Sequence, residues 1–150
     1  MVGRGPPCAS GRERGRSGAL GGYRPVVSQI RNLERILAGF DETWMPRIVT
    51  QVNDYDVRVA KVEGDHAWHV HRDTDEFFLV LTGEFTINLR SGPVVLGPGD
   101  TYVVPKGTEH FPQAAPGTAI LMFEPTGTPS TGDDGVDADH LTTTTGVELD

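Results

Sequence analysis

The distribution of apolar and polar residues along the chain predicts a series of short β-strands. Val57 and Val59 alternate with Asp56 and Arg58, as expected of a sheet with one buried face. Glycine and proline separate the alternating segments. The pattern predicts about eight strands, of which the clearest lie at 48–52, 55–62, 76–81, 84–89, 94–96, 101–104 and 118–123. Such a series of short strands is typical of an all-β jelly-roll barrel.

The strand that begins at Glu76 differs from the others because it is apolar on both faces. Glu76, Phe78 and Val80 share one face, and Phe77 and Leu79 point to the other. If the first face lines the barrel, the second must also be covered. We expect a second sheet, the N-terminal helix or a second copy of the chain to cover it.

A helical spacing of apolar residues precedes the strands. Ile30, Leu33 and either Ile36 or Leu37 recur every three or four positions, with Ser28 as the candidate N-cap. The spacing predicts a short helix over 28–38 that packs against the barrel.

Composition divides the 150 residues into three parts. Residues 1–25 contain seven of the 19 glycines and almost no large apolar side chain, so they predict a disordered basic extension. An arm that binds an acidic partner is the alternative. Residues 26–130 are expected to form one barrel domain. Residues 131–150 lack periodicity and predict a C-terminal tail, partly draped over the barrel and partly mobile.

The net charge of −8 conceals an asymmetry. Residues 1–25 contain five arginines and one acid, Glu13, which leaves a net charge of −12 for 26–150. An acidic domain disfavours nucleic acid and anionic membranes as partners. Cys8 is the only cysteine, so neither a disulfide framework nor a thiolate metal site is expected. The sequence shows no long apolar run and no secretory signal, so we expect a cytoplasmic protein.

Three histidines and one glutamate form the candidate site. His69 and His71 are two residues apart, so on a β-strand their imidazoles point to the same face and can reach one ion. Glu76 follows after a loop of suitable length and opens the next strand. His110 lies far enough along the chain to return by another strand. We therefore predict a metal site formed by these four residues.

Glycines and a proline accompany these ligands at fixed spacings. The first group reads Gly64, His69, His71, Glu76 and Gly83, and the second reads Gly99, Pro105, Gly107 and His110. In this order the chain resembles the small single-domain cupins of the cupin 2 type, often described as mannose-6-phosphate isomerase-like. The resemblance spans roughly 44–133. It implies a double-stranded β-helix barrel with one metal ion, and homodimers are frequent in the family. Gly64 is one residue closer to His69 than usual, and Ala114 stands where asparagine is common.

Three neutral imidazoles and one carboxylate leave two adjacent positions open on an octahedral divalent ion. Iron, manganese, nickel, zinc and copper all suit this set of nitrogen and oxygen donors. The open positions suit a bidentate oxygen ligand, such as a hydroxy acid or an enediol. The metal can then act as a Lewis acid or, if it is iron, bind oxygen beside the substrate.

The remaining site predictions concern the pocket wall and proton transfer. Glu76 and His66 are the candidate catalytic residues, although His66 has the opposite strand parity to His69 and is expected in a loop or at the surface. Glu84, Glu109 and Tyr102 are further candidates for a second titratable group. The predicted substrate-binding residues are Phe78, Val80, Tyr102, Phe111 and Met122.

Two functions remain open from the sequence. The first is a metal-dependent enzyme, a dioxygenase, isomerase or lyase, acting on a small oxygen-rich metabolite. The second is a metal-dependent module that binds or senses a small molecule without turnover. True phosphomannose isomerase activity is disfavoured, because those enzymes resemble this site but have glutamine where His69 stands. The residues before the barrel cannot supply a helix-turn-helix, so we expect no nucleic-acid partner.

Overall fold

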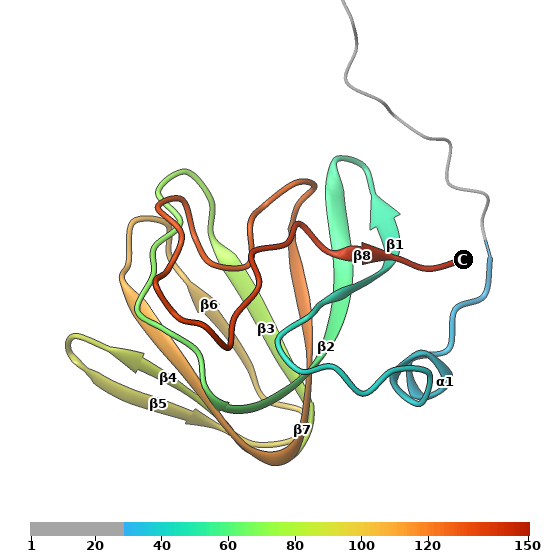
Figure 1. The fold of residues 1–150 in the computed structure, drawn as a ribbon, viewed down its shortest axis with the longest axis horizontal. Coiled ribbons are helices and arrows are strands. Elements are labelled where there is room, and N and C mark those ends of the chain that lie inside the picture. Colours follow the sequence, from blue (N-terminus) through green and yellow to red (C-terminus); the bar gives the residue numbers. More distant parts are fainter. Residues whose placement is uncertain (1–28) are drawn as a thin grey trace, which may run out of the picture.

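The structure is a computed structural model that describes residues 29–150. The predicted basic extension, 1–25, and the candidate cap Ser28 lie outside the described residues. Within residues 29–150, one short helix precedes eight strands (Figure 1). The elements are α1 (Leu33–Leu37), β1 (Arg47–Val52), β2 (Tyr55–Asp65), β3 (Glu76–Thr82), β4 (Phe85–Leu89), β5 (Gly92–Leu96), β6 (Thr101–Val104), β7 (His110–Pro125) and β8 (Val147–Glu148). The predicted mostly-β barrel fold with a short N-terminal helix is confirmed.

The long strand β7 connects the two layers of the barrel. Its first residues pair with β4, and its later residues pair with β2 on one side and β3 on the other. β6 extends the sheet beyond β3, and β5 extends it beyond β4. In Figure 1, the β4–β5 hairpin therefore lies apart from β1 and β2, and the space between the layers is the core.

Inward-facing and outward-facing residues alternate along β3, as the sequence predicts. In β3, Phe78 and Val80 are buried at 2% and 1% exposure, whereas Phe77 and Leu79 are half-buried on the outer face. Phe78 packs against Phe85 with the two rings tilted by 51° and their centroids 5.1 Å apart. Each buried aromatic side chain contributes about 1.5–3 kcal/mol of hydrophobic stabilisation. The homodimer predicted to cover the outer face stays a prediction.

Two segments differ from the sequence-based prediction. The helix is shorter than expected, because Asn32 rather than a residue near 28 caps it by accepting a hydrogen bond from the Arg35 amide at 3.0 Å. The segment that contains His69 and His71 does not form a regular strand. His69 instead makes an isolated antiparallel bridge with His110.

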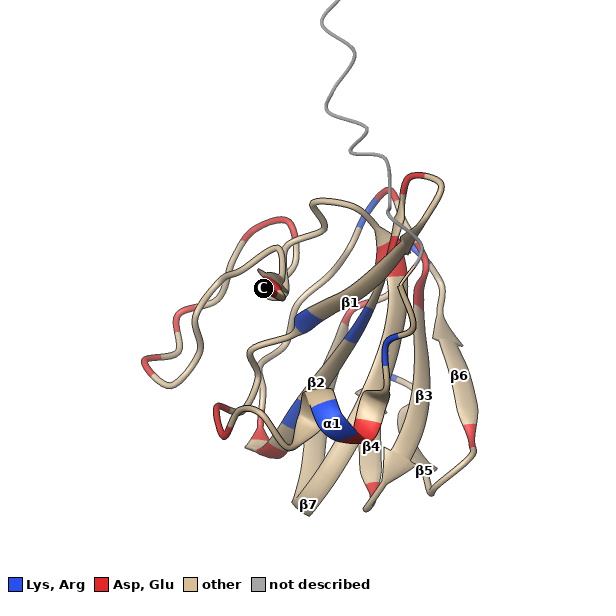
Figure 2. Ribbon diagram, turned by 90° about the vertical axis from the view of Figure 1, so that its right-hand side faces the viewer, with Lys and Arg blue, Asp and Glu red and all other residues tan. Residues whose placement is uncertain are grey.

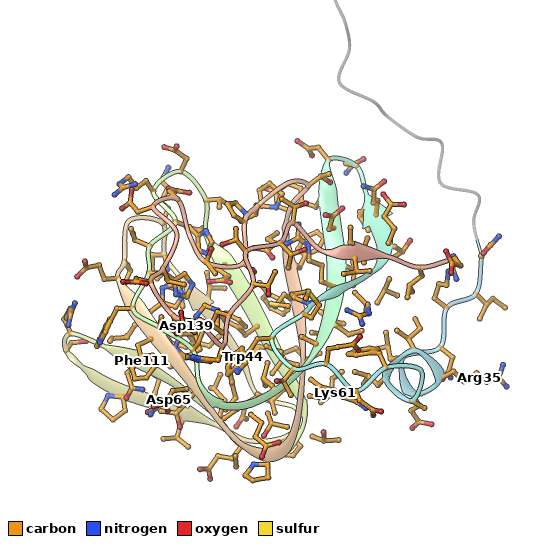
Figure 3. All side chains as sticks on the ribbon, viewed as in Figure 1. Arg35, Trp44, Lys61, Asp65, Phe111 and Asp139 are labelled. Carbon is orange, nitrogen blue, oxygen red and sulfur yellow. The ribbon has the colours of Figure 1, made fainter. Side chains whose placement is uncertain are left out.

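The C-terminal segment folds back over the barrel. The amide of Asp133 donates to the carbonyl of Val70 at 3.0 Å, and β8 pairs in parallel with β1. Figure 2 shows acidic positions on the loops of this segment, whereas basic positions fall on α1, β1 and β2. In Figure 3, Trp44 lies within the barrel and Arg35 projects outward from α1. Within 29–150, the structure shows no helix of the length and apolar character that crossing a membrane requires.

Candidate metal centre

The four predicted ligands converge inside the barrel. His69 and His71 lie on the segment that follows β2, Glu76 is the first residue of β3, and His110 is the first residue of β7. All four side chains are buried. The bridge between His69 and His110 aligns the two chain segments, with each backbone amide donating to the carbonyl of the other residue at 3.0 Å. The pairing therefore places two imidazoles side by side, with ring centroids 4.2 Å apart.

The distances between the ligand atoms suit a shared metal ion. His110 Nε2 lies 2.9 Å from Glu76 Oε2, and His71 Nε2 lies 3.5 Å from the same oxygen. One ligand atom from each of the four residues lies within 4.8 Å of all the others. Two donors bound about 2.1 Å from one ion at a right angle would be roughly 3.0 Å apart.

Backbone carbonyls orient two of the imidazoles. His69 Nδ1 lies 2.9 Å from the carbonyl oxygen of Ala67, and His110 Nδ1 lies 3.0 Å from that of Thr108. A carbonyl only accepts, so each Nδ1 carries the proton that it donates. A proton on Nδ1 leaves Nε2 as the atom of each ring that would bind a metal, which is the usual arrangement of histidine ligands. In the metal-free chain the Nε2 of His110 instead donates to Glu76 Oε2, and a metal would replace that proton.

His71 provides the test of whether a metal fits these residues. Its side chain is 3% exposed, and neither ring nitrogen has a hydrogen-bond partner among residues 29–150. Leaving a buried polar group without a partner costs about 1–3 kcal/mol. An ion bound to Nε2 would satisfy the nitrogen that faces Glu76. The donor set and this unpartnered imidazole both fit a divalent cation.

Burial and charge keep the cluster in a state suited to metal binding. Burial lowers the pKa of His69 to about 3, so this imidazole is neutral at pH 7. Burial would raise the pKa of Glu76, but the hydrogen bond from His110 and the nearby imidazoles outweigh it and lower that pKa to about 2. Burial lowers the pKa of His110, whereas the hydrogen bond to Glu76 and the charge of Glu76 raise it and prevail. The glutamate is therefore an anion that a cation can bind.

A small cavity adjoins the ligands. Its volume is about 30 Å³, compared with the roughly 10–15 Å³ that one water molecule requires. His69 and Glu76 line it together with Phe78 and Met122, two of the predicted substrate-binding residues. The apolar walls and the few polar groups are typical of a small-molecule site.

The other three predicted wall residues lie elsewhere. Val80 is buried in the core, and Tyr102 packs against that core from β6. Phe111 packs against Trp68, with ring centroids 5.8 Å apart. None of the three lines this cavity in the structure described here. A substrate role for them stays a prediction.

His66 lies in the loop after β2, as its parity suggested, but it is buried rather than at the surface. It is 7% exposed and lines the cavity, with its ring 5.0 Å from that of Trp44 and 4.8 Å from that of His69. Because β2 ends at Asp65, strand parity does not determine which way the side chain of His66 points. Burial lowers the pKa of His66, which favours the neutral imidazole. Its predicted catalytic role stays a prediction.

The sequence analysis missed a second polar cluster beside the cavity. Arg58 on β2 is fully buried between Glu124 Oε1, 2.7 Å away, and Asp56 Oδ2, 2.9 Å away. The carbonyl of Thr128 accepts a further hydrogen bond from Arg58 at 2.9 Å. Glu124 also lines the cavity.

The position of Glu124 could have been inferred from its strand parity. It follows Ile120 and Met122 on the inward face of β7, where a carboxylate needs a buried partner. Burial raises its pKa to about 8, with the charge of Glu76 acting in the same direction and Arg58 opposing it.

Comparisons with known proteins agree with this fold. The model of the family described as Cupin domain matches residues 55–123. Over 99 residues, the chain is 35% identical to the uncharacterized protein YdbB of Bacillus subtilis (strain 168), covering 65% of this chain and 88% of YdbB.

Two solved structures illustrate the similarity in three dimensions. A cupin-2 domain containing protein from Shewanella frigidimarina NCIMB 400 is 40% identical, with a TM-score of 0.62, over 63% of this chain and 92% of that one. Hydroquinone 1,2-dioxygenase PnpCD, in complex with Cd²⁺ and 4-hydroxybenzonitrile, is 19% identical, with a TM-score of 0.57, over 71% of this chain and 82% of that one. The second similarity concerns the fold alone.

Proposed function

The chain belongs to the cupin domain family, and from that premise we propose that it is a metal-dependent enzyme acting on a small oxygen-rich metabolite. The observation that carries the proposal is the convergence of His69, His71, Glu76 and His110 beside a cavity. These residues would hold one divalent ion, with iron, manganese, nickel, zinc and copper as the candidates.

A bound divalent ion would supply Lewis-acid polarisation of a substrate oxygen or, as iron, a place for oxygen beside the substrate. The chain supplies the remaining functions. The carbonyls of Ala67 and Thr108 fix two imidazoles, so the ligand set is preorganised. Phe78 and Met122 exclude water from one side of the cavity. His66 lies close enough to the ligand cluster to exchange a proton with a bound molecule.

Dioxygenase, isomerase and lyase chemistry all suit the ligand set. PnpCD shares the fold and is named as a hydroquinone 1,2-dioxygenase. It supports dioxygenase chemistry for this chain by analogy of fold alone. The second candidate function is a metal-dependent module that binds or senses a small molecule. The small volume of the cavity, about 30 Å³, favours this candidate, because it leaves less room for a reacting substrate than the roughly 300–1,000 Å³ typical of ligand pockets.

The charge of the chain supports a small molecule as the partner. The net charge is −8, and a negatively charged protein repels nucleic acid and anionic lipid. We propose that the protein acts in the cytoplasm on a soluble metabolite.

Metal reconstitution followed by activity screening tests the proposal. Purified protein would be loaded anaerobically with each candidate metal, mixed with a metabolite extract and monitored for oxygen uptake and for changes by mass spectrometry. We expect turnover that depends on one metal and is absent from the His71→Ala variant. Retention of a metabolite without any product would favour the sensing module. Failure of every metal to bind would contradict both functions.

A further inference from the structure

One carboxylate oxygen beside the metal cluster has no structural role. Glu124 is 2% exposed, and its Oε1 atom binds Arg58. Its Oε2 atom has no hydrogen-bond partner within the described part of the chain. The same side chain lines the cavity that Glu76 lines. A buried polar atom of this kind requires an explanation in terms of a ligand or water.

Pairing with Arg58 does not account for Glu124. Asp56 already supplies one carboxylate to this single cation, through Oδ2 at 2.9 Å. The other oxygen of Asp56 accepts hydrogen bonds from Gln51 and Thr126, each at 2.9 Å. Arg58 therefore faces two buried carboxyl groups, those of Asp56 and Glu124. One carboxylate would be enough to balance the charge of the single guanidinium.

The strand register places Glu124 next to the metal ligands. β3 and β7 are antiparallel, with Phe77 opposite Phe123 and Phe78 opposite Met122. Continuing this register by one residue brings Glu76 and Glu124 to neighbouring positions on the inward face. Glu124 is not one of the four residues whose ligand atoms cluster within 4.8 Å of one another. It therefore lies beside the metal position, in contact with the cavity.

The other polar side chain near this end of the cavity is already satisfied. Ser130 Oγ donates to the carbonyl of Thr142 at 3.3 Å and accepts from the amide of Thr144 at 3.2 Å. Ala60, Val62 and Ile120 supply apolar wall. Among these groups, Glu124 is the one that offers an unused hydrogen-bonding atom to a bound molecule.

We propose that Glu124 determines specificity by binding a hydroxyl group adjacent to the chelating oxygens of the substrate. This inference rests on the proposed function and narrows the substrate class to hydroxylated compounds with three neighbouring oxygens, such as polyhydroxy acids. A hydroxyl suits this position because it both donates and accepts a hydrogen bond, and so pairs with a carboxyl in either protonation state. Arg58 holds the Glu124 side chain in place through Oε1.

Two small chelating probes test the proposal. Lactate and glycerate share the same α-hydroxy carboxylate, and they differ in a methyl group against a hydroxymethyl group. Calorimetric titration of the zinc-loaded full chain should show that glycerate binds about tenfold more tightly, as expected for one hydrogen bond to a carboxyl group. Glu124→Met should bring the two affinities to within about twofold of each other. The control Glu63→Gln removes an exposed carboxylate and should keep the preference.

The outcomes separate this inference from the proposed function. Binding of both probes with equal affinity to the wild-type protein overturns the role of Glu124 and leaves the metal proposal standing. A preference for glycerate that survives in Glu124→Met also overturns the role of Glu124 and leaves the metal proposal standing. Failure of both probes to bind the zinc-loaded protein contradicts the proposed function and this inference together. Glu124→Gln keeps the shape and a hydrogen-bonding group, so we expect it to fold and to retain part of the preference. If Glu124→Met does not fold, an undiminished preference for glycerate in Glu124→Gln counts against the proposal.

Discussion

His110 Nε2 lies 2.9 Å from Glu76 Oε2, although 34 residues separate the two in the chain. They are the first residues of β7 and β3, and these strands pair with each other further along. The metal cluster therefore forms only when the barrel closes. An unfolded chain does not present the four ligands together, so metal binding and folding should be linked.

Removing the metal should lower the stability of the protein. A ligand that binds only the folded state stabilises it by about 2.7 kcal/mol at a concentration 100 times its Kd. We expect thermal unfolding to shift to a lower temperature when EDTA is added and to recover when the metal is restored. His71→Ala should show little response to either addition. Equal responses in the wild type and this variant would mean that the metal binds elsewhere.

The buried cluster around Arg58 should be sensitive to loss of its cation. Arg58→Met leaves Asp56 and Glu124 buried without a positive partner, and breaking such a cluster costs about 3–5 kcal/mol. Urea denaturation would measure the change in free energy of unfolding. Glu109→Gln is the matched control, since Glu109 pairs with Arg90 on the exposed surface and its loss should cost less than about 1 kcal/mol.

Gly132 should be required for the C-terminal segment to pack on the metal site. It has a φ of +74°, and a Cβ atom there would lie 2.6 Å from the carbonyl oxygen of Val70 and 3.0 Å from the Cβ of His69. Gly135 has a similar φ of +68° but no atom within 4 Å of such a Cβ. Both alanine variants incur about 1–2 kcal/mol of backbone strain, and Gly132→Ala adds the steric clash. We expect Gly132→Ala to unfold at lower urea and to bind metal more weakly than Gly135→Ala. Identical behaviour would show that the contact is not required.

The metal-free protein should lose stability steeply below pH 4.5. The pKa of Glu76 is lowered to about 2 and that of His69 to about 3, so the unfolded chain takes up protons before the folded chain does. The stability that both groups contribute is present above their unfolded pKa values and is lost as the pH falls towards 3. Glu124, whose pKa is raised to about 8, is already protonated in the folded state below pH 4.5, whereas the unfolded carboxyl takes up its proton near pH 4.5, so Glu124 offsets a small part of this slope.

Each of these two groups contributes up to about 1.4 kcal/mol per pH unit in that window. Urea denaturation of the metal-free protein between pH 4.5 and pH 3 would measure the slope. Glu76→Gln should reduce the slope of unfolding free energy against pH by the contribution of one proton. An unchanged slope in that variant would contradict the lowered pKa of Glu76.

Much of the barrel could be predicted from local pattern. The inward positions of Phe78 and Val80 follow from the period of two in a strand, and the buried faces agree. The ligand set followed from the order of His69, His71, Glu76 and His110 and from the glycines around them.

The features that the sequence did not predict depend on contacts between distant segments. His66 is buried against the rings of Trp44 and His69, which strand parity alone does not indicate. Strand parity indicates the inward position of Glu124, but its pairing with Asp56 across β2 and β7 depends on the register of the two strands. The path of the C-terminal segment depends on the hydrogen bond from Asp133 to Val70, about sixty residues earlier in the chain.

Metal analysis of the purified protein tests the central claim most directly. The wild type and the variants His71→Ala and His140→Ala would be purified without chelators, loaded with one metal and measured for bound metal and for circular dichroism. His140 is the matched control, because it is exposed and hydrogen-bonds the carbonyl of Asp65 outside the cluster. We expect one metal per chain in the wild type and in His140→Ala, and a folded barrel without metal in His71→Ala. A full complement of metal in folded His71→Ala, or none in the wild type, would contradict the account.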